Sequence, residues 1–251
     1  MTASELVLEQ DGAIAIVRIA RAARRNALGD ALVAALQRTL RRHDEDEAVA
    51  GIVITGVPPG FCAGSDLKEL GTMSLAEICE HEARTAAFCR EIATLKKPVL
   101  AAVEGFALGG GVGLATSCDV VVTARSTRWN LPEVEIGWIP PWGNEALINR
   151  VGLARARQLV WGGRPFNGEE ALRLGVADHL ADDGKACALA VELAQGLARL
   201  PREAVASTKL YFATQAARDG EAGDLLASRL FREDCRHPVA QATLRKFGVR
   251  A

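Results

Sequence analysis

A glycine-rich stretch in the middle of the chain, GFALGGGVGLATSCD at residues 105–119, could bind a negatively charged oxygen atom. Three consecutive glycines, Gly109–Gly111, are followed by Gly113, and no charged residue occurs before Asp119. A strand that enters a helix through glycines leaves several backbone N–H groups free at the helix start. Such donors can stabilise an oxyanion, although close packing of a helix on a strand would also require glycines.

The spacing of these glycines excludes two common nucleotide-binding loops. GxxxxGK[ST] is absent because Val112, Gly113 and Leu114 follow the third glycine, and GxGxxG fails because Leu114 stands at its last glycine. The stretch is also too short to cross a bilayer, which requires about 20 apolar residues. Only 14 residues separate Glu104 from Asp119, and five of them are glycine.

A second loop of similar composition, GFCAGSDLKEL at residues 60–70, follows an apolar segment. Ala63 and Gly64 are small, and Asp66 is placed to cap the helix that follows, although it could also act as an acid or base. Two such strand-to-helix turns could offer two N–H groups to one carbonyl oxygen.

Two side chains in this second loop, Cys62 and Ser65, could act as nucleophiles. An activated thiol or hydroxyl needs a neighbouring base. Because no histidine occurs in either loop, we do not expect nucleophilic catalysis here.

The elements around these loops alternate strands with helices in the first half of the chain. We expect a β-hairpin at 5–19, buried strands at 50–56, 98–105 and 119–124, and helices from Asp30 and over 74–95. From about residue 144 the pattern is helical, with segments at 168–175, 184–200, 202–218 and 222–235. This order predicts an α/β fold with a helical C-terminal region.

The composition is that of an ordinary globular protein. The 251 residues fit one large domain, or one domain with an appendage, and the net charge of −1 argues against nucleic-acid or anionic-membrane binding. The six cysteines show no CxxC spacing and the four histidines are scattered, so we expect no metal site. Cysteines in apolar contexts and an N-terminus without a signal pattern favour a cytoplasmic protein.

Three segments, taken in order, resemble the enoyl-CoA hydratase/isomerase family, also called the crotonase superfamily. GIVITGVPPGFCAGSDLKEL is similar to the family's first oxyanion segment, and KKPVLAAVEGFALGGGVGLATSCDVVVTA to its second. NLPEVEIGWIPP is similar to the segment that carries a catalytic glutamate. The resemblance begins at RAARRNAL, residues 21–28, and extends to the helical tail.

This resemblance implies a crotonase-like ββα spiral core over residues 1–195 and a C-terminal helical trimerisation region over residues 196–251. It implies a homotrimer or a dimer of trimers that acts on an acyl-CoA thioester. No separate cofactor is expected, because coenzyme A is part of the substrate.

The resemblance also implies the roles of individual residues. The backbone N–H groups of Ser65 and Gly110 would form the oxyanion hole, and Glu133, 23 residues after Gly110, would be the acid/base group. Hydratases of the family use two glutamates, and the position of the first is Gly113 in this chain. Half of the hydratase pair is therefore absent.

The expected substrate-binding residues come from three segments. RAARRNAL resembles a family motif whose second residue is proline, here Ala22, and its arginines would lie near the CoA phosphates. Trp138 and Trp142 are better candidates for a pocket wall than Trp129, although all three could equally be core residues. The full set is Arg24, Arg25, Ala63, Asp66, Leu67, Trp138 and Trp142.

Another carboxylate, Glu135, is two residues beyond Glu133. In an extended segment both side chains would share one face, so Glu135 could replace the missing glutamate, or it could lie in solvent.

Several functions remain open from the sequence. A lone glutamate suits an enoyl-CoA isomerase, which takes a proton from one carbon and returns it to another. Glu133 alone could also serve a hydratase, a hydratase-lyase or a thioesterase in which it activates water. A non-catalytic CoA-binding scaffold is the alternative from another class, and Gly113 is its best support.

Overall fold

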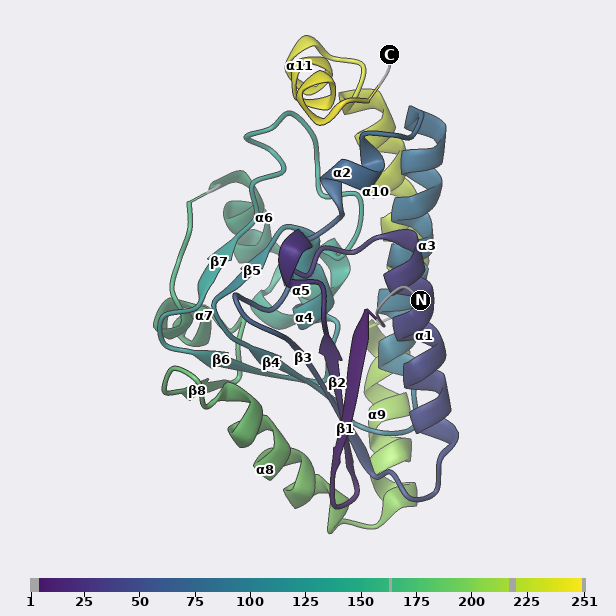
Figure 1. The fold of residues 1–251 in the computed structure, drawn as a ribbon, viewed down its shortest axis with the longest axis vertical. Coiled ribbons are helices and arrows are strands. Elements are labelled where there is room, and N and C mark those ends of the chain that lie inside the picture. The colour runs from purple at the N-terminus through teal and green to yellow at the C-terminus, as the bar shows by residue number, and fades with distance from the viewer. Residues whose placement is uncertain (1–4, 163, 217–219, 250–251) are drawn as a thin grey trace.

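The computed structural model describes residues 5–162, 164–216 and 220–249. Its central sheet has the strand order β1-β2-β3-β4-β6-β8, with β1 antiparallel to β2 and the other neighbours parallel (Figure 1). These strands are β1 Leu6–Asp11, β2 Ile14–Ile19, β3 Gly51–Gly56, β4 Val99–Val103, β6 Val120–Ala124 and β8 His179–Ala181. A smaller parallel sheet pairs β5 Phe106–Leu108 with β7 Arg128–Asn130.

Helices cover both faces of the central sheet and continue into the C-terminal region (Figure 1). In the first part of the chain they are η1 Ala22–Arg24, α1 Asp30–Glu45, α2 Leu67–Leu70, α3 Leu75–Thr94 and α4 Gly110–Thr116. The later helices are α5 Asn144–Val151, α6 Leu153–Gly162, α7 Gly168–Leu174, α8 Ala186–Ala198, α9 Arg202–Ala216, α10 Gly220–Asp234 and α11 Pro238–Phe247.

The inner strands β3 and β4 are almost entirely apolar because each is buried on two sides. Every residue of β4 is buried, and so is every residue of β3 except the last. In β3, Val53 belongs to the core layer under α8, whereas Ile52 and Ile54 belong to the layer that includes α1 and α3. This alternation follows from the two-residue period of side chains along a strand.

The structure confirms the predicted hairpin, the three predicted strands and the long helices to within a few residues, although residues 217 and 218 of the predicted helix 202–218 lie outside the described residues. The helix that begins at Asp30 buries Leu32, Leu36 and Leu40, as its spacing predicts. The three-residue strands β5, β7 and β8 were not predicted, and neither was α11. No helix of the described residues is long and apolar enough to cross a membrane.

Asn26 joins the turn after β2 to the loop after β3. Its Nδ2 donates hydrogen bonds to the carbonyl oxygens of Val57 at 2.7 Å and Gly60 at 2.6 Å. Its Oδ1 accepts from the N–H of Arg21 at 2.9 Å, and the residue is completely buried at a φ of 56°. Asparagine tolerates this left-handed conformation better than most residues with a side chain.

We therefore expect Asn26→Ala to lower the free energy of unfolding by about 3 kcal/mol, because it leaves buried backbone groups without partners. Urea unfolding followed by circular dichroism measures the change. Thr72→Ala, which removes an exposed hydroxyl that donates to the carbonyl oxygen of Glu69, is the control. A loss for Asn26→Ala no larger than that of the control would contradict the prediction.

Candidate active site

The two glycine-containing loops lie against each other. Cys62 pairs with Ala107 of β5 in an isolated β-bridge, and the N–H of Leu108 donates to the carbonyl oxygen of Cys62 at 3.0 Å. A Cβ atom on Gly64 would lie 2.9 Å from the backbone nitrogen of Gly110, and Gly64 has a φ of +83°. Only glycine fits this position, because both the contact and the backbone conformation exclude a side chain.

This contact places two backbone donors side by side. Ser65 follows Gly64, and Gly110 is the first residue of α4. In the described part of the chain, neither the N–H of Ser65 nor that of Gly110 donates a hydrogen bond. Two free N–H groups from adjacent loops can hold one negatively charged oxygen.

The carboxyl group of Glu133 lies beside these donors. Its Oε1 would be 2.7 Å from a Cβ atom on Gly109, the residue before α4. The side chain is buried, and Oε2 has no hydrogen-bond partner among the described residues. Burial raises the pKa of Glu133 to about 7; its own backbone N–H lowers it, and the nearby charge of Glu82 raises it further. A carboxyl group with this pKa can both accept and donate a proton at neutral pH.

The indole ring of Trp142 occupies the place of a side chain at position 113. A Cβ atom on Gly113 would be 2.6 Å from Cζ3 of the ring, and one on Gly110 would be 2.7 Å from Cζ2. The ring therefore packs directly against two glycines of α4. With Trp142 in this position, no side chain fits at Gly113. The tryptophan ring thus occupies the space that a glutamate at position 113 would need.

A second buried carboxylate, Glu82 of α3, was not predicted from the sequence. Its Oε1 accepts a hydrogen bond from Oγ of Ser65 at 2.8 Å, and its Oε2 accepts from Nε1 of Trp142 at 2.6 Å. One signal could have indicated it: Glu82 is four residues from both Ile78 and Ala86, which are buried on the same face of α3.

Glu135 lies in solvent, which was the second of its two predicted placements. The extended segment that would have put it beside Glu133 is not formed. The chain from residue 133 onward makes a tight turn, in which the N–H of Trp138 donates to the carbonyl oxygen of Glu133 at 3.1 Å. Glu135 is exposed as a result. The second carboxylate near Glu133 comes from α3 instead.

A cavity of about 510 Å³ opens beside these groups. Each residue expected from the sequence to act in the site lines it: Arg24, Arg25, Ala63, Ser65, Asp66, Leu67, Gly110, Glu133, Trp138 and Trp142. The wall also contains residues that the sequence did not indicate, among them Lys68, Ile78, Phe231, Leu244 and Phe247. The last three belong to α10 and α11, so the C-terminal helices complete the cavity.

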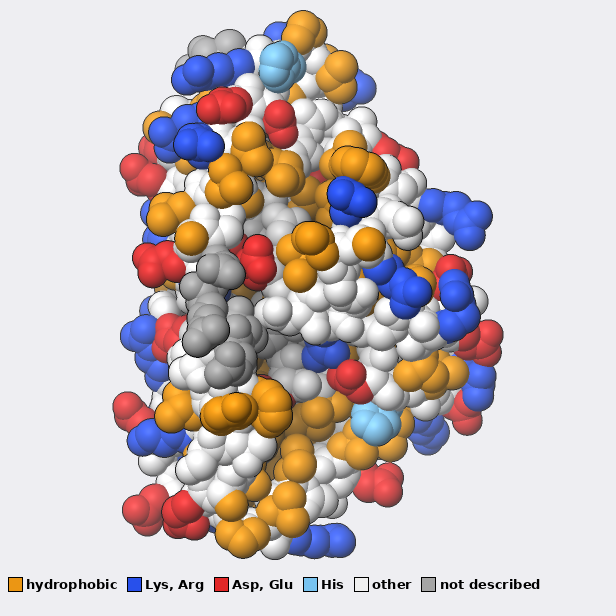
Figure 2. All heavy atoms as spheres, turned by 180° about the vertical axis from the view of Figure 1, so that it is seen from behind, with side chains coloured by type: hydrophobic (Ala, Val, Ile, Leu, Met, Phe, Trp, Pro, Cys, Tyr) orange, Lys and Arg blue, Asp and Glu red, His pale blue; other side chains and the backbone are white. Residues whose placement is uncertain are grey.

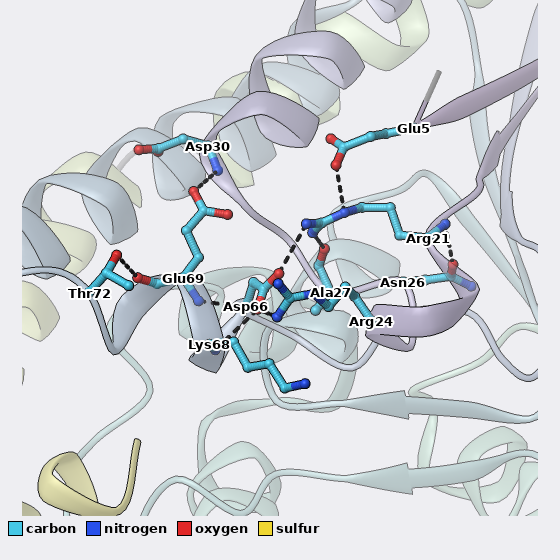
Figure 3. A network of polar contacts seen from close by, with 10 residues as sticks. All are labelled: Glu5, Arg21, Arg24, Asn26, Ala27, Asp30, Asp66, Lys68, Glu69 and Thr72. Carbon is cyan, nitrogen blue, oxygen red and sulfur yellow. Dashed lines mark hydrogen bonds and ion pairs between the residues drawn. The ribbon is translucent and has the colours of Figure 1, made fainter. Parts of the chain in front are cut away.

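Asp66 lies at the centre of a network of polar contacts that includes Arg21 and Arg24 (Figure 3). Asp66 caps α2 by accepting from the N–H groups of Lys68 and Glu69, as predicted, and it forms ion pairs with Arg21 at 3.0 Å and Arg24 at 3.5 Å. These bonds show a structural role for Asp66. With Arg25 and Lys68, Arg24 gives the cavity rim positive charge suited to phosphate groups.

The tryptophans divide between the core and the cavity. Trp129 is completely buried, donates from Nε1 to Oγ1 of Thr123 at 3.0 Å, and stacks on Phe166. Trp138 packs edge-to-face on Phe231 of α10 at a centroid distance of 5.7 Å. Trp138 and Trp142 line the cavity, and Trp129 is a core residue.

The thiol of Cys62 is a packed core group. It is completely buried, and this burial raises its pKa to about 12, so it stays protonated at neutral pH and is a poor nucleophile. Across the described residues, no group of three or more His, Cys, Asp or Glu side chains is arranged to hold a metal ion.

Comparison with known proteins agrees with this geometry. A family model described as enoyl-CoA hydratase/isomerase matches residues 9–248. Human mitochondrial methylglutaconyl-CoA hydratase is 33% identical over 231 residues, which is 90% of this chain and 67% of that protein. The short-chain-enoyl-CoA hydratase of Clostridium acetobutylicum is 32% identical over 196 residues, 77% of this chain and 75% of that protein.

Solved structures show the same fold. The crystal structure of an enoyl-CoA hydratase/isomerase from Mycobacterium paratuberculosis superposes with a TM-score of 0.85 at 28% identity, covering 97% of this chain and 98% of that one. The α/β fold with helical C-terminal region is thus the crotonase fold expected from the three sequence segments. By sequence, fold and the arrangement of its two glycine loops, the chain belongs to the enoyl-CoA hydratase/isomerase family.

Proposed function

We propose that this acyl-CoA enzyme is an isomerase that moves a proton between two carbon atoms of an enoyl-CoA, with Glu133 as its acid/base group. One observation carries the proposal. Among the described residues, the only buried carboxyl oxygen at the cavity wall that lacks a partner is Oε2 of Glu133, and it lies beside two free backbone donors.

The proposed reaction requires no external reactant. Glu133 removes a proton from C2 of a 3-enoyl-CoA, and the electron pair moves into the thioester carbonyl. The N–H groups of Ser65 and Gly110 stabilise the resulting negative oxygen, an interaction for which each donor contributes about 3 kcal/mol in comparable sites. Protonated Glu133 then returns the proton to C4, which leaves the double bond between C2 and C3.

Concerted hydration by two carboxylates is less well supported. Trp142 fills the place of the first glutamate, and both oxygens of Glu82 already accept hydrogen bonds. The relatives named above are nevertheless called hydratases, which favours water addition by Glu133 alone as the second candidate. The two reactions differ in their products, and an isotope experiment separates them.

The residues that line the cavity suit both the charged CoA part and the apolar acyl part of an acyl-CoA substrate. Arg24, Arg25 and Lys68 supply positive charge for the CoA phosphates, and the wall formed by Ile78 and Trp138, among others, is apolar. We propose no separate cofactor, since the thioester supplies the acidity at C2.

The assembly and location expected from the sequence also remain proposals. We propose a spiral core over 1–195, a trimerisation region over 196–251, and a trimer or a dimer of trimers, supported by the exposed side chains of Leu210, Tyr211 and Phe212 on α9. Hydrophobic side chains gather in several groups on the face seen in Figure 2. A cytoplasmic location stays a prediction, and the human relative is named as mitochondrial.

We expect the protein to convert a 3-enoyl-CoA to the 2-enoyl-CoA in D₂O with deuterium uptake, and Glu133→Gln to slow this by at least about 100-fold. Mass spectrometry of the acyl-CoA pool measures both events. Glu135→Gln, which neutralises the exposed carboxylate two residues away, is the matched control and should leave the rate unchanged.

Different products would contradict the isomerase. Water addition to a 2-enoyl-CoA without migration of the double bond supports the hydratase, and release of free acid supports a thioesterase. Binding without any reaction supports the scaffold.

The raised pKa of Glu133 predicts a pH-dependent penalty on stability. The folded protein holds this proton up to about pH 7, whereas the unfolded chain loses it near the ordinary glutamate pKa of 4.5. Glu133 therefore does not destabilise the folded protein below pH 4.5. Between pH 4.5 and about 7 its ionisation in the unfolded chain progressively lowers the free energy of unfolding. Over that range, the free energy of unfolding of Glu133→Gln should rise relative to wild type by about 3 kcal/mol. Urea titrations from about pH 4 to about pH 8 cover the range in which the group titrates; a constant difference would contradict the prediction.

The match between Gly113 and Trp142 predicts strong coupling between the two positions. Gly113→Glu should lower the free energy of unfolding by at least about 1 kcal/mol more in the wild-type protein than in the Trp142→Ala variant. Only the variant that lacks the indole ring leaves room for the new side chain. Urea unfolding of the two single variants and the double variant measures this coupling. Gly196→Glu on α8, where a Cβ atom meets nothing within 4 Å, is the control and should show no coupling to Trp142.

A further inference from the structure

Glu82 connects three segments that meet at the cavity. It lies on α3, one of its oxygens accepts from Ser65 in the first glycine loop, and the other accepts from Trp142 in the loop before α5. An ionised carboxylate is only an acceptor, so two donors on two oxygens suit it well. Three parts of the site are thereby held by one side chain.

Burying the carboxylate of Glu82 carries a desolvation cost that a purely structural contact would not require. Glu82 is 5% exposed, and the described residues place no cation within ion-pair distance of it. An apolar or amide side chain would fill this position at a lower desolvation cost. The burial of Glu82 is therefore not offset by an ion pair among the described residues, and its two hydrogen bonds show which groups it holds.

The two contacts of Glu82 fix one group that the proposed reaction uses and one that shapes the space beside Glu133. The bond to Oγ of Ser65 fixes the residue whose N–H faces the thioester oxygen. The bond to Nε1 of Trp142 fixes the ring against Gly110 and Gly113, so that the ring closes the space where a second acid/base group would lie. If the ring turned away, water could enter beside Glu133.

We propose that Glu82 is a positioning residue of this site, which fixes the oxyanion loop through Ser65 and holds Trp142 in place of the side chain absent at Gly113. Glu82 and Glu133 both line the cavity, and the charge of Glu82 raises the pKa of Glu133 in addition to the larger effect of burial. Glu82 does not transfer the proton, because both of its oxygens are already engaged. The kinetic part of this inference rests on the proposed function, whereas its electrostatic part does not.

Two variants at position 82 separate charge from hydrogen bonding. Glu82→Gln keeps the shape: its amide oxygen can accept from Nε1 of Trp142, and its amide nitrogen can donate to Oγ of Ser65. It therefore removes the charge and reverses the direction of the hydrogen bond to the serine. Glu82→Leu removes both the charge and the hydrogen bonds. Trp142→Phe keeps a ring against α4 but removes its N–H. Glu80→Gln, on the same helix with a side chain 73% exposed, is the matched control.

The first measurement requires no substrate. Carbon-13 NMR of protein labelled at Cδ of glutamate gives the pKa of Glu133, whose signal is identified by its absence in Glu133→Gln. We expect Glu82→Gln to lower this pKa by roughly half a unit or more, because it removes a like charge. Glu80→Gln should leave it unchanged. An unchanged pKa in Glu82→Gln would overturn the electrostatic part of the proposal, whatever reaction the protein catalyses.

The second measurement uses the acyl-CoA on which the protein proves active. Glu82→Leu and Trp142→Phe should lower kcat by roughly tenfold to a hundredfold, with KM changed by less than about threefold, because positioning acts on the reacting atoms. Glu82→Gln should recover a substantial part of kcat, since its hydrogen bonds remain. A wild-type kcat in Trp142→Phe, or changes in KM alone, would overturn the positioning role. If Glu82→Leu does not fold, Glu82→Gln and Trp142→Phe still decide the question.

Discussion

The site depends on the close approach of two stretches of backbone. Gly64 and Gly110 are so near that a single added carbon atom on the first would collide with the nitrogen of the second. A hydrogen-bonded pairing between the loop that contains Cys62 and the short strand β5 holds them there. This pairing lies at the end of the central parallel sheet, where the chain leaves β3 and β4. The register of that sheet thus sets the distance between the two free N–H groups, and the side chains of the site are arranged around it.

At position 113 an aromatic ring takes the space that a carboxylate side chain would otherwise fill. Where a hydratase of the family would have a first glutamate, this chain has a glycine, and the freed volume is filled by an aromatic ring from a distant loop. The ring is tied to a buried carboxylate on α3. The number of carboxylates near the cavity is thereby restored to two, but only Glu133 has a buried oxygen without a partner among the described residues. The arrangement favours a single proton carrier surrounded by fixed acceptors and donors.

Local patterns were enough to predict the elements that frame the site. The apolar runs of β3, β4 and β6 and the spacing of leucines in α1 are determined by burial, which leaves a direct trace in the sequence. The oxyanion loops and Glu133 followed from family resemblance, since three glycines or a Pro-Glu pair also occur in many proteins for reasons of packing or turn formation alone.

Contacts between residues that are far apart in the sequence produce no local pattern from which they could be predicted. The spacing of Glu82 from Ile78 and Ala86 could have indicated its burial but not its partners, because Ser65 and Trp142 are 17 and 60 residues away. The placement of Glu135 stayed open for a related reason. A two-residue spacing puts side chains on one face only in an extended segment, and the chain after Glu133 forms a tight turn.

The residues that line the cavity come from two separate parts of the chain. The proposed oxyanion donors and the proposed proton carrier lie before residue 134, whereas Phe231, Leu244 and Phe247, from the last two helices, line the apolar part of the cavity. During synthesis, the part of the chain that carries the proposed catalytic groups emerges from the ribosome first, and the cavity wall is completed only when α10 and α11 pack against it. Evolution can consequently recast the shape of the acyl chamber through the tail alone, while the backbone geometry that activates the thioester stays unchanged.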